Sequence, residues 1–205
     1  VNVEIVDFAG GSKALQAVVG GSADVVSGAY EHTIKLQGKK QYFTAFVQQA
    51  RAPQIVLAVS TKTMPNYKTL ADLRGKKIGV TAPGSSTNMV ASFVLDGAGV
   101  NSKEVSFIGV GAGSGAVAAM KTGQIDAIAN LDPVISSLER DGAIKVLVDT
   151  RKMSATREVF GGDMPAGSLY APEAFIKANP KTVQGMTNAM VKAARWIHPA
   201  RFDAL

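Results

Sequence analysis

The sequence predicts an α/β fold made of two similar lobes, each with a parallel-rich sheet flanked by helices. Residues 3–30 align with residues 105–132 without a gap, so that Ser12 falls on Ser114 and Gly21 on Gly123. Each copy has an apolar run, a Gly/Ser turn, an Ala-rich stretch, a glycine and a second apolar run, the order expected of a strand, a helix and a strand. Such units build parallel sheets. A single recurrence at this spacing indicates duplicated lobes, the alternative being a chance likeness between two ordinary units.

The elements after the first repeat follow from apolar runs and their stop signals. We expect a helix at 32–38 and strands at 42–48 and 54–60. The chain then changes lobe. Thr69 and Asp72 form a capping-box pattern, which predicts a short helix at the start of the second lobe.

The second lobe continues with alternating strands and helices around the second repeat. The expected elements outside the repeat are a strand at 77–81, a helix at 86–98, a helix at 133–141, a strand at 144–148 and an irregular Gly/Pro segment at 161–167. Pro172 and Pro180 then each begin a helix, the second ending near residue 197. We therefore assign residues 1–62 and 167–205 to lobe 1 and residues 63–166 to lobe 2.

The strand at 77–81 and the helix at 86–98 have no counterpart before the first repeat. If the lobes are equivalent, a matching strand and helix precede Val1 in the complete protein, together with a leader peptide.

Composition excludes several classes of function. The chain has 205 residues, 46% of them hydrophobic, with no cysteine and two histidines, so neither a thiolate nor a multi-histidine metal site is expected. The net charge of +6 is spread over scattered Lys and Arg residues, which does not indicate nucleic-acid binding. The common hydrolase, metalloprotease and P-loop motifs are absent. We expect a protein that is not an enzyme and that uses no cofactor.

Ligands of parallel α/β sheets bind beyond the carboxyl ends of the strands. Four loops there contain small or hydroxyl residues, at 9–12, 27–33, 82–87 and 129–133. Small residues let a ligand approach the backbone, and free N–H groups at helix starts favour an anion or a polar oxygen. The sequence therefore predicts a site shared by loops of both lobes.

Hydroxyl residues at two helix starts are the first candidates for ligand contact. Ser85, Ser86 and Thr87 lie together at one start, and Gly11 and Ser12 at the corresponding turn of the other lobe. Capping of the helix is the alternative role of each hydroxyl.

Tyr30 and Asp132 occupy the same repeat position, yet one is aromatic and the other acidic, as expected of a site between two different lobes. Asn130 is a further polar candidate, and Glu31 and His32 follow Tyr30 directly. The alternatives are that Asp132 caps the following helix and that His32 is an ordinary polar residue at a helix start.

Three further patterns each have two interpretations. Gly111, Gly113 and Ala116 match a G-x-G-x-x-A fingerprint, which makes a dinucleotide-binding enzyme the competing hypothesis. Arg51 is either an anion partner or a solvated side chain. Phe160, with the two glycines after it, forms either a loop over the cleft or a plain turn.

Nearly the whole chain resembles the periplasmic solute-binding proteins of ABC importers for nitrate, taurine and sulfonates, the NMT1/THI5-like family. The resemblance is carried by GGSKALQAVVGGSADVVSGAYEHTIKLQ, DLRGKKIGVTAPGSSTN, GAGSGAVAAMKTGQIDAIANLDPVI and VFGGDMPAGSLY. It implies a two-lobed, type II periplasmic-binding-protein-like fold whose hinge crossovers let the lobes close on a small anionic or polar solute.

The resemblance also implies partners and a location. These are a membrane permease of the ABC class and a periplasmic or lipid-anchored, extracytoplasmic setting. We expect a monomer, with association between chains if the first lobe is incomplete. The family's contacts map onto Ser12, the loop 30–32, the cluster 85–87 and the loop 130–132. Enzymes of thiamine pyrimidine synthesis share this fold but use His and Cys features that are absent here.

Overall fold

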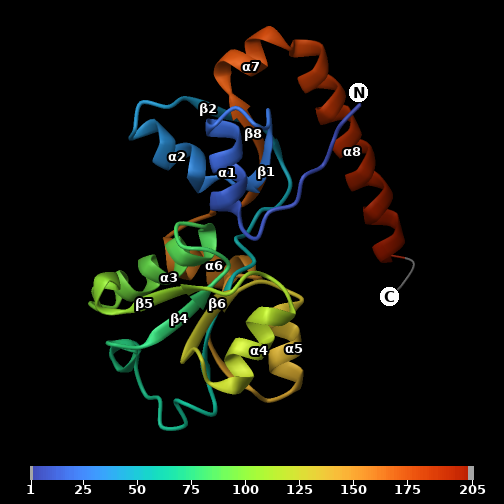
Figure 1. Ribbon diagram of the computed structural model, residues 1–205. Coiled ribbons are helices and arrows are strands. Elements are labelled where there is room, and N and C mark those ends of the chain that lie inside the picture. The colour runs from blue at the N-terminus through green and yellow to red at the C-terminus, as the bar shows by residue number, and fades with distance from the viewer. Residues whose placement is uncertain (1, 203–205) are drawn as a thin grey trace.

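The structure, a computed structural model, describes residues 2–202 and contains two β-sheets in separate parts of the molecule (Figure 1). We call them the small sheet and the large sheet. No helix of the described residues is both long and apolar enough to span a membrane. Within the same residues, no cluster of His, Asp and Glu side chains is arranged to bind a metal ion.

The small sheet has three strands in the order β1 (Val26–Ala29), β8 (Gly167–Pro172) and β2 (Phe43–Gln48). Both of its strand pairs are antiparallel, because β8 returns from the far end of the chain and inserts between β1 and β2. Helices α1 (Gly11–Val19) and α2 (Glu31–Gln37) pack against it. Its core contains Val18, Val26, Leu36, Phe43 and Tyr170.

The large sheet has five strands, and its two parallel pairs lie on either side of β4. The order is β5 (Ser106–Gly109), β4 (Lys77–Val80), β6 (Ala127–Asn130), β3 (Val56–Ser60) and β7 (Ile144–Asp149). The pairs that include β3 are antiparallel.

Helices cover both faces of the large sheet. All five residues of β3 are buried, and its apolar side chains alternate between the two sides. Leu57 and Val59 pack with α3 (Ser86–Gly97), whereas Val56 and Ala58 pack with α4 (Ser114–Thr122) and α5 (Val134–Arg140). Burial on both faces is the usual state of a central strand in an α/β fold.

The repeat in the sequence corresponds to a repeat in the structure. Helix α1 matches α4 and strand β1 matches β6, each within one residue of the predicted register. Gly21 and Gly123, which share a repeat position after these helices, both have positive φ angles, 77° and 83°. Only glycine adopts this conformation without strain, which explains its presence in both copies.

The structure differs from the predicted elements in three places. Residues 3–8 form no strand; their apolar side chains are largely exposed, and no described strand pairs with them. Helix α6 (Met153–Phe160) and strand β8 lie where no regular element was expected. A strand needs a pairing neighbour, and β8 finds two between β1 and β2, whereas residues 3–8 find none.

The expected first lobe boundary, after residue 62, does not coincide with the boundary between the sheets. Strand β3 lies inside the large sheet, since its fully buried run requires cover on both faces. The expectation of a parallel-rich sheet in the first lobe also differs from the antiparallel pairs observed there. The chain returns to the small sheet at Gly167, the first residue of β8.

Two crossover segments, 49–55 and 161–166, connect the sheets and are paired. The backbone N–H of Ala50 donates to the Gly167 carbonyl at 3.1 Å, and the N–H of Ala166 donates to the Ala50 carbonyl at 3.1 Å. After β8 the chain ends in α7 (Glu173–Ala178) and the long helix α8 (Pro180–Phe202), which extends along one side of the molecule (Figure 1). Two short 3-10 helices, η1 (Leu70–Leu73) and η2 (Ser102–Glu104), flank β4 and β5.

Candidate functional site

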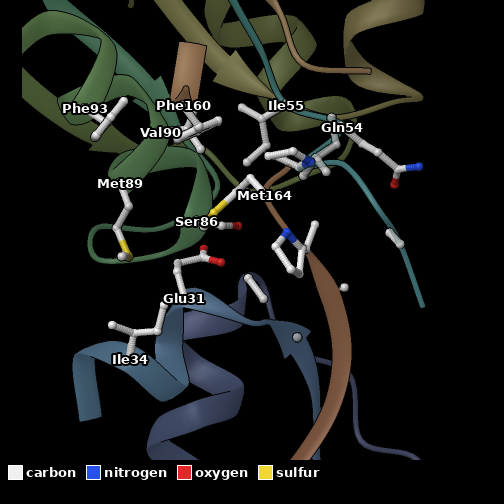
Figure 2. Close-up of a pocket in the computed structure, with 18 residues that line it drawn as sticks. Glu31, Ile34, Gln54, Ile55, Ser86, Met89, Val90, Phe93, Phe160 and Met164 are labelled. Atoms are coloured by element: carbon white, nitrogen blue, oxygen red, sulfur yellow. The ribbon is translucent and has the colours of Figure 1, made fainter. Parts of the chain in front are cut away.

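A cleft of about 570 Å³ lies where the two sheets and the two crossovers meet (Figure 2). The small-sheet side contributes β1 and the first turn of α2, and the large-sheet side contributes α3 and the end of α6. Residues 50, 53–55 and 164–166 of the crossovers, with Gly167 at the start of β8, complete the lining; Arg51 lies outside it. The cleft is therefore bounded by chain segments that are far apart in the sequence.

The large-sheet side of the cleft is apolar. Phe93 of α3 and Phe160 of α6 stack, with ring centroids 5.0 Å apart and an interplanar angle of 27°. Met89, Val90 and Met164 extend this surface (Figure 2). Aromatic and thioether side chains of this kind bind flat or branched apolar groups.

Glu31, the first residue of α2, provides the single ionisable side chain of the cleft lining. Its Oε1 atom is buried and has no hydrogen-bond partner among the described residues. Burial raises the pKa of the Glu31 carboxyl above 4.5, and a bond from its own backbone N–H opposes this only in part. The remaining polar side chains of the lining are those of Gln54 and Ser86.

Beside the cleft, the start of α1 contacts the start of α3. The Ser12 N–H donates to Ser85 Oγ at 3.1 Å, the two hydroxyls are 3.1 Å apart, and Ser12 Oγ donates to the Pro83 carbonyl at 3.2 Å. Gly10 makes this approach feasible, because a Cβ atom there would lie 3.0 Å from Ser85 Oγ and 3.1 Å from Ala82 Cβ. These two serines thus join the lobes.

His32 and Tyr170 form a buried polar pair under the small-sheet side. The distance from His32 Nδ1 to the Tyr170 hydroxyl is 3.0 Å, and Nε2 has no partner among the described residues. Burial lowers the pKa of His32; the nearby Gly84 carbonyl raises it in part, and Lys35 lowers it further. Burial also raises the pKa of Tyr170, and the negative charge of Glu31 raises it further. A Cβ at Gly11 would lie 3.1 Å from the His32 ring, so this glycine is needed for packing.

Thr87 and Asn130 are buried and hold the backbone. The Thr81 N–H donates to Thr87 Oγ1 at 3.0 Å, and the two threonine hydroxyls are 2.9 Å apart. Asn130 Nδ2 donates to the Gly111 carbonyl at 2.9 Å, while its Oδ1 accepts from the Leu131 N–H. Their polar atoms are thus engaged within the protein.

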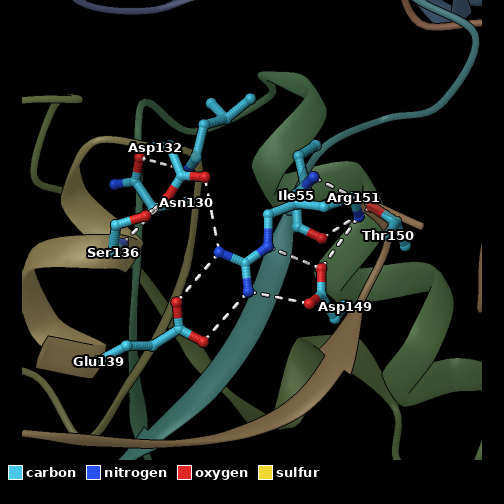
Figure 3. A network of polar contacts seen from close by, with 9 residues as sticks. Ile55, Asn130, Asp132, Ser136, Glu139, Asp149, Thr150 and Arg151 are labelled. Carbon is cyan, nitrogen blue, oxygen red and sulfur yellow. Dashed lines mark hydrogen bonds and ion pairs between the residues drawn. The ribbon is translucent and has the colours of Figure 1, made fainter. Parts of the chain in front are cut away.

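Asp132 belongs to a polar network on the surface (Figure 3). Its Oδ1 accepts bonds from the Ser136 N–H and hydroxyl, which caps α5 and lowers the pKa of Asp132. Arg151 lies 3.5 Å from Asp132 and forms closer pairs with Glu139 at 3.0 Å and Asp149 at 2.9 Å. The capping alternative for Asp132 is thus the one that the geometry supports.

Of the ten predicted site residues, the structure places two in the cleft lining, Glu31 and Ser86. Ser12 and Ser85 join the lobes beside it, and Tyr30 precedes α2, with its N–H donating to the Ala166 carbonyl. The five others have the structural contacts given above; they are Gly11, His32, Thr87, Asn130 and Asp132.

Several lining residues were missed from the sequence. Phe160 alone had a signal, its position before two glycines, and it does face the cleft. Phe93, Met89 and Met164 look like ordinary apolar residues of a helix or loop, and their exposure to the cleft depends on how the lobes face each other. Gly111 and Ala116 of the dinucleotide fingerprint lie outside the lining; Ala116 is buried against the large sheet.

The chain is similar to several solved structures. It is 64% identical to a protein of Bordetella bronchiseptica RB50, with a TM-score of 0.93, covering 94% of this chain and 61% of that one. It thus spans less than two thirds of that relative's length. Comparison with curated proteins gave no match.

More distant likenesses show the fold. The alkanesulfonate-binding protein of Xanthomonas axonopodis pv. citri, bound to MOPS, has a TM-score of 0.70 at 22% identity, covering 97% of this chain and 64% of that one. The periplasmic nitrate-binding protein of Synechocystis PCC 6803 has a TM-score of 0.70 at 17% identity, covering 95% and 54%. The predicted two-lobed α/β fold of type II periplasmic binding proteins is therefore confirmed. A sequence profile of the NMT1-like family matches residues 1–204, and the chain belongs to that family.

Proposed function

We propose that this chain is the solute-binding part of an ABC importer, which captures a small organic solute between its lobes and delivers it to a membrane permease. The observation that carries the proposal is the cleft, whose lining comes from the small sheet with α2, from α3 and α6 beside the large sheet, and from both crossovers. Family membership and the names of the related structures support it. They favour a binding role over the dinucleotide-binding and thiamine-pyrimidine alternatives.

The division into lobes is part of the proposal. Lobe 1 contains the small sheet with α1, α2, α7 and α8, and lobe 2 contains the large sheet with α3 to α6. The paired crossovers at 49–55 and 161–166 form the hinge. Closure about such a hinge buries the solute and presents one joined surface to the permease.

Location, oligomeric state and chemistry follow from the same proposal. Its relatives are named periplasmic, so we propose an extracytoplasmic location. The chain acts as a monomer and does not change its solute chemically. Sedimentation velocity checks the first statement, and recovery of unaltered solute after binding checks the second.

Isothermal titration of the purified chain tests the binding role. The panel contains nitrate, taurine, alkanesulfonates, aromatic carboxylates, pyrimidines and aromatic amines. At least one compound should bind saturably, and Phe160→Ala should weaken its binding about tenfold, because it removes one ring of the stacked pair. Tyr42→Ala is the matched control, since Tyr42 is exposed and lies outside the lining. The absence of saturable binding across the panel would contradict the proposed function.

A further inference from the structure

The charge of the cleft is opposite to what an anion requires. Its described lining contains no Lys, Arg or His, whereas it does contain the carboxyl group of Glu31. The chain as a whole carries a net charge of +6, so this negative cleft does not follow from overall composition. A second negative group placed against Glu31 would be repelled most strongly where water is excluded.

One oxygen of the Glu31 carboxyl is also unusual in having no protein partner. This atom, Oε1, is buried without a hydrogen bond, and Glu31 forms no ion pair with any described residue. In contrast, Asp132, Asp149 and Glu139 all pair with Arg151. A buried acceptor without a donor is costly unless a ligand supplies one.

The Glu31 side chain also faces the start of α3 across the cleft (Figure 2). The side chain projects into the cleft from the small-sheet side, facing the end of α3 that carries Ser86 (Figure 2). A helix start favours negative charge, and here a carboxylate of the protein itself is directed toward it. An incoming sulfonate or nitrate would have to share this region with Glu31.

Since the remaining cleft wall is apolar, we propose that the solute is an organic amine or amidine, whose cationic N–H group donates to Glu31 while its apolar body packs on Phe93, Phe160 and Met164. This inference rests on the proposed function and names its solute class. Glu31 then selects solutes by their charge, and the stacked rings of Phe93 and Phe160 select them by their shape.

The groups around Glu31 define how binding depends on pH. His32 and Lys35 lie on the same helix, Tyr170 lies on β8, and the lining residues of α3 are not ionisable. A cation binds the ionised carboxylate, so affinity for an amine rises as the pH rises through the raised pKa of Glu31 and the carboxyl loses its proton. Affinity for an anion would change in the opposite direction.

The test uses three probes of the same shape and different charge: benzylamine, benzyl alcohol and phenylmethanesulfonate. Isothermal titration of the full chain should rank benzylamine first and phenylmethanesulfonate last. Glu31→Gln should weaken benzylamine binding roughly 10- to 100-fold and remove its rise with pH, while leaving benzyl alcohol within about threefold.

Glu104→Gln is the matched control. Glu104 is also a carboxylate, but it lies in η2, and its side chain is half exposed and paired with Arg74 outside the cleft. This variant should bind benzylamine like the original chain. A rise with pH that persists in Glu31→Gln would assign the effect to another group, such as His32, and would overturn the inference.

Two outcomes separate this inference from the proposed function. Saturable binding of phenylmethanesulfonate or nitrate that exceeds amine binding, and that weakens in Phe160→Ala, would leave the binding role intact and overturn the assignment of an amine. If none of the three probes and no compound of the wider panel binds, both proposals fail. Circular dichroism of Glu31→Gln confirms that a loss of binding is not a loss of folding.

Discussion

Polar residues at the boundary between the lobes fall into two groups, according to whether all of their buried polar atoms have hydrogen-bond partners within the protein. Ser85, Thr87 and Asn130 are buried with their polar atoms engaged inside the protein. Glu31 and His32 each retain one buried atom without a partner among the described residues. The first group stabilises the loops, whereas burial raises the pKa of Glu31 and lowers the pKa of His32 in the second group.

At Tyr170 we predict a loss of stability from removing one hydroxyl. Tyr170→Phe leaves His32 Nδ1 buried without the partner that lies 3.0 Å away. We expect the free energy of unfolding to fall by about 1–3 kcal/mol in urea denaturation. An unchanged free energy of unfolding would show that water reaches this ring and that the pair is not buried in solution.

At Glu31 we predict a pH-dependent gain of stability. Because the folded pKa is raised above 4.5, the folded state binds a proton more tightly than the unfolded state does. The stabilisation is therefore present at pH values below 4.5 and is lost as the pH rises through the folded pKa. Without ligand, Glu31→Gln should match the original chain in acid and should melt at a higher temperature near neutral pH.

Differential scanning calorimetry at both pH values measures this difference. Comparison with the original chain cancels the titration of His32, which both proteins share. A Glu31→Gln variant that is less stable than the original at neutral pH would contradict the raised pKa.

Among the elements, α1 and α3 make the contact that joins the lobes. Gly10→Ala puts a Cβ 3.0 Å from Ser85 Oγ and 3.1 Å from Ala82 Cβ, both in lobe 2. Gly10 has an extended backbone, so alanine causes no strain within lobe 1 itself. We expect a more open molecule, with a larger radius of gyration by small-angle X-ray scattering and weaker solute binding. An unchanged radius would mean that the contact does not limit opening.

The Arg151 network joins β7 to α5 and to the loop before it (Figure 3). Arg151→Ala leaves Asp132, Glu139 and Asp149 close together without their cation. We expect a loss of about 1–2 kcal/mol in the free energy of unfolding, with a smaller loss at high salt, because the residual repulsion is screened. A loss that does not depend on salt would indicate packing of the Arg151 stem as the cause.

Elements with strong local signals were predictable, and those defined by distant pairing were not. The repeat predicts α1, α4, β1 and β6 nearly to the residue, because glycine turns and apolar periodicity are local properties. Strand β8 exists because it pairs with β1 and β2, more than a hundred residues earlier. Residues 3–8 have strand character, yet no neighbour pairs with them in the described part of the chain.

The difference between local signals and distant contacts also explains which site residues could be predicted from the sequence. Ser86 and Glu31 were found because helix starts are visible in a sequence. Phe93 was not found, since its partner Phe160 lies 67 positions later and their stacking depends on the fold. For Asp132 the sequence leaves ligand contact and helix capping open, and the bonds from the Ser136 N–H and hydroxyl in the structure support capping.

For the molecule as a whole, we propose that a small solute is held between two lobes that move about the paired crossovers. In the proposed division, the large sheet, covered on both faces, is the core of lobe 2. The small sheet, with a smaller core, belongs to lobe 1. The contacts between the lobes at Ser12 and Ser85 are few enough to break and re-form.

The most direct test measures the distance between the lobes with and without solute. The chain has no cysteine, so Lys39→Cys and Lys103→Cys, one exposed position on each lobe, can carry spin labels without competing sites. Double electron–electron resonance is recorded before and after saturation with the solute that titration identifies. We predict a shift to one narrower and shorter distance distribution, which Phe160→Ala should reach only at about tenfold higher solute concentration. Saturable binding that leaves the distribution unchanged would contradict capture between the lobes.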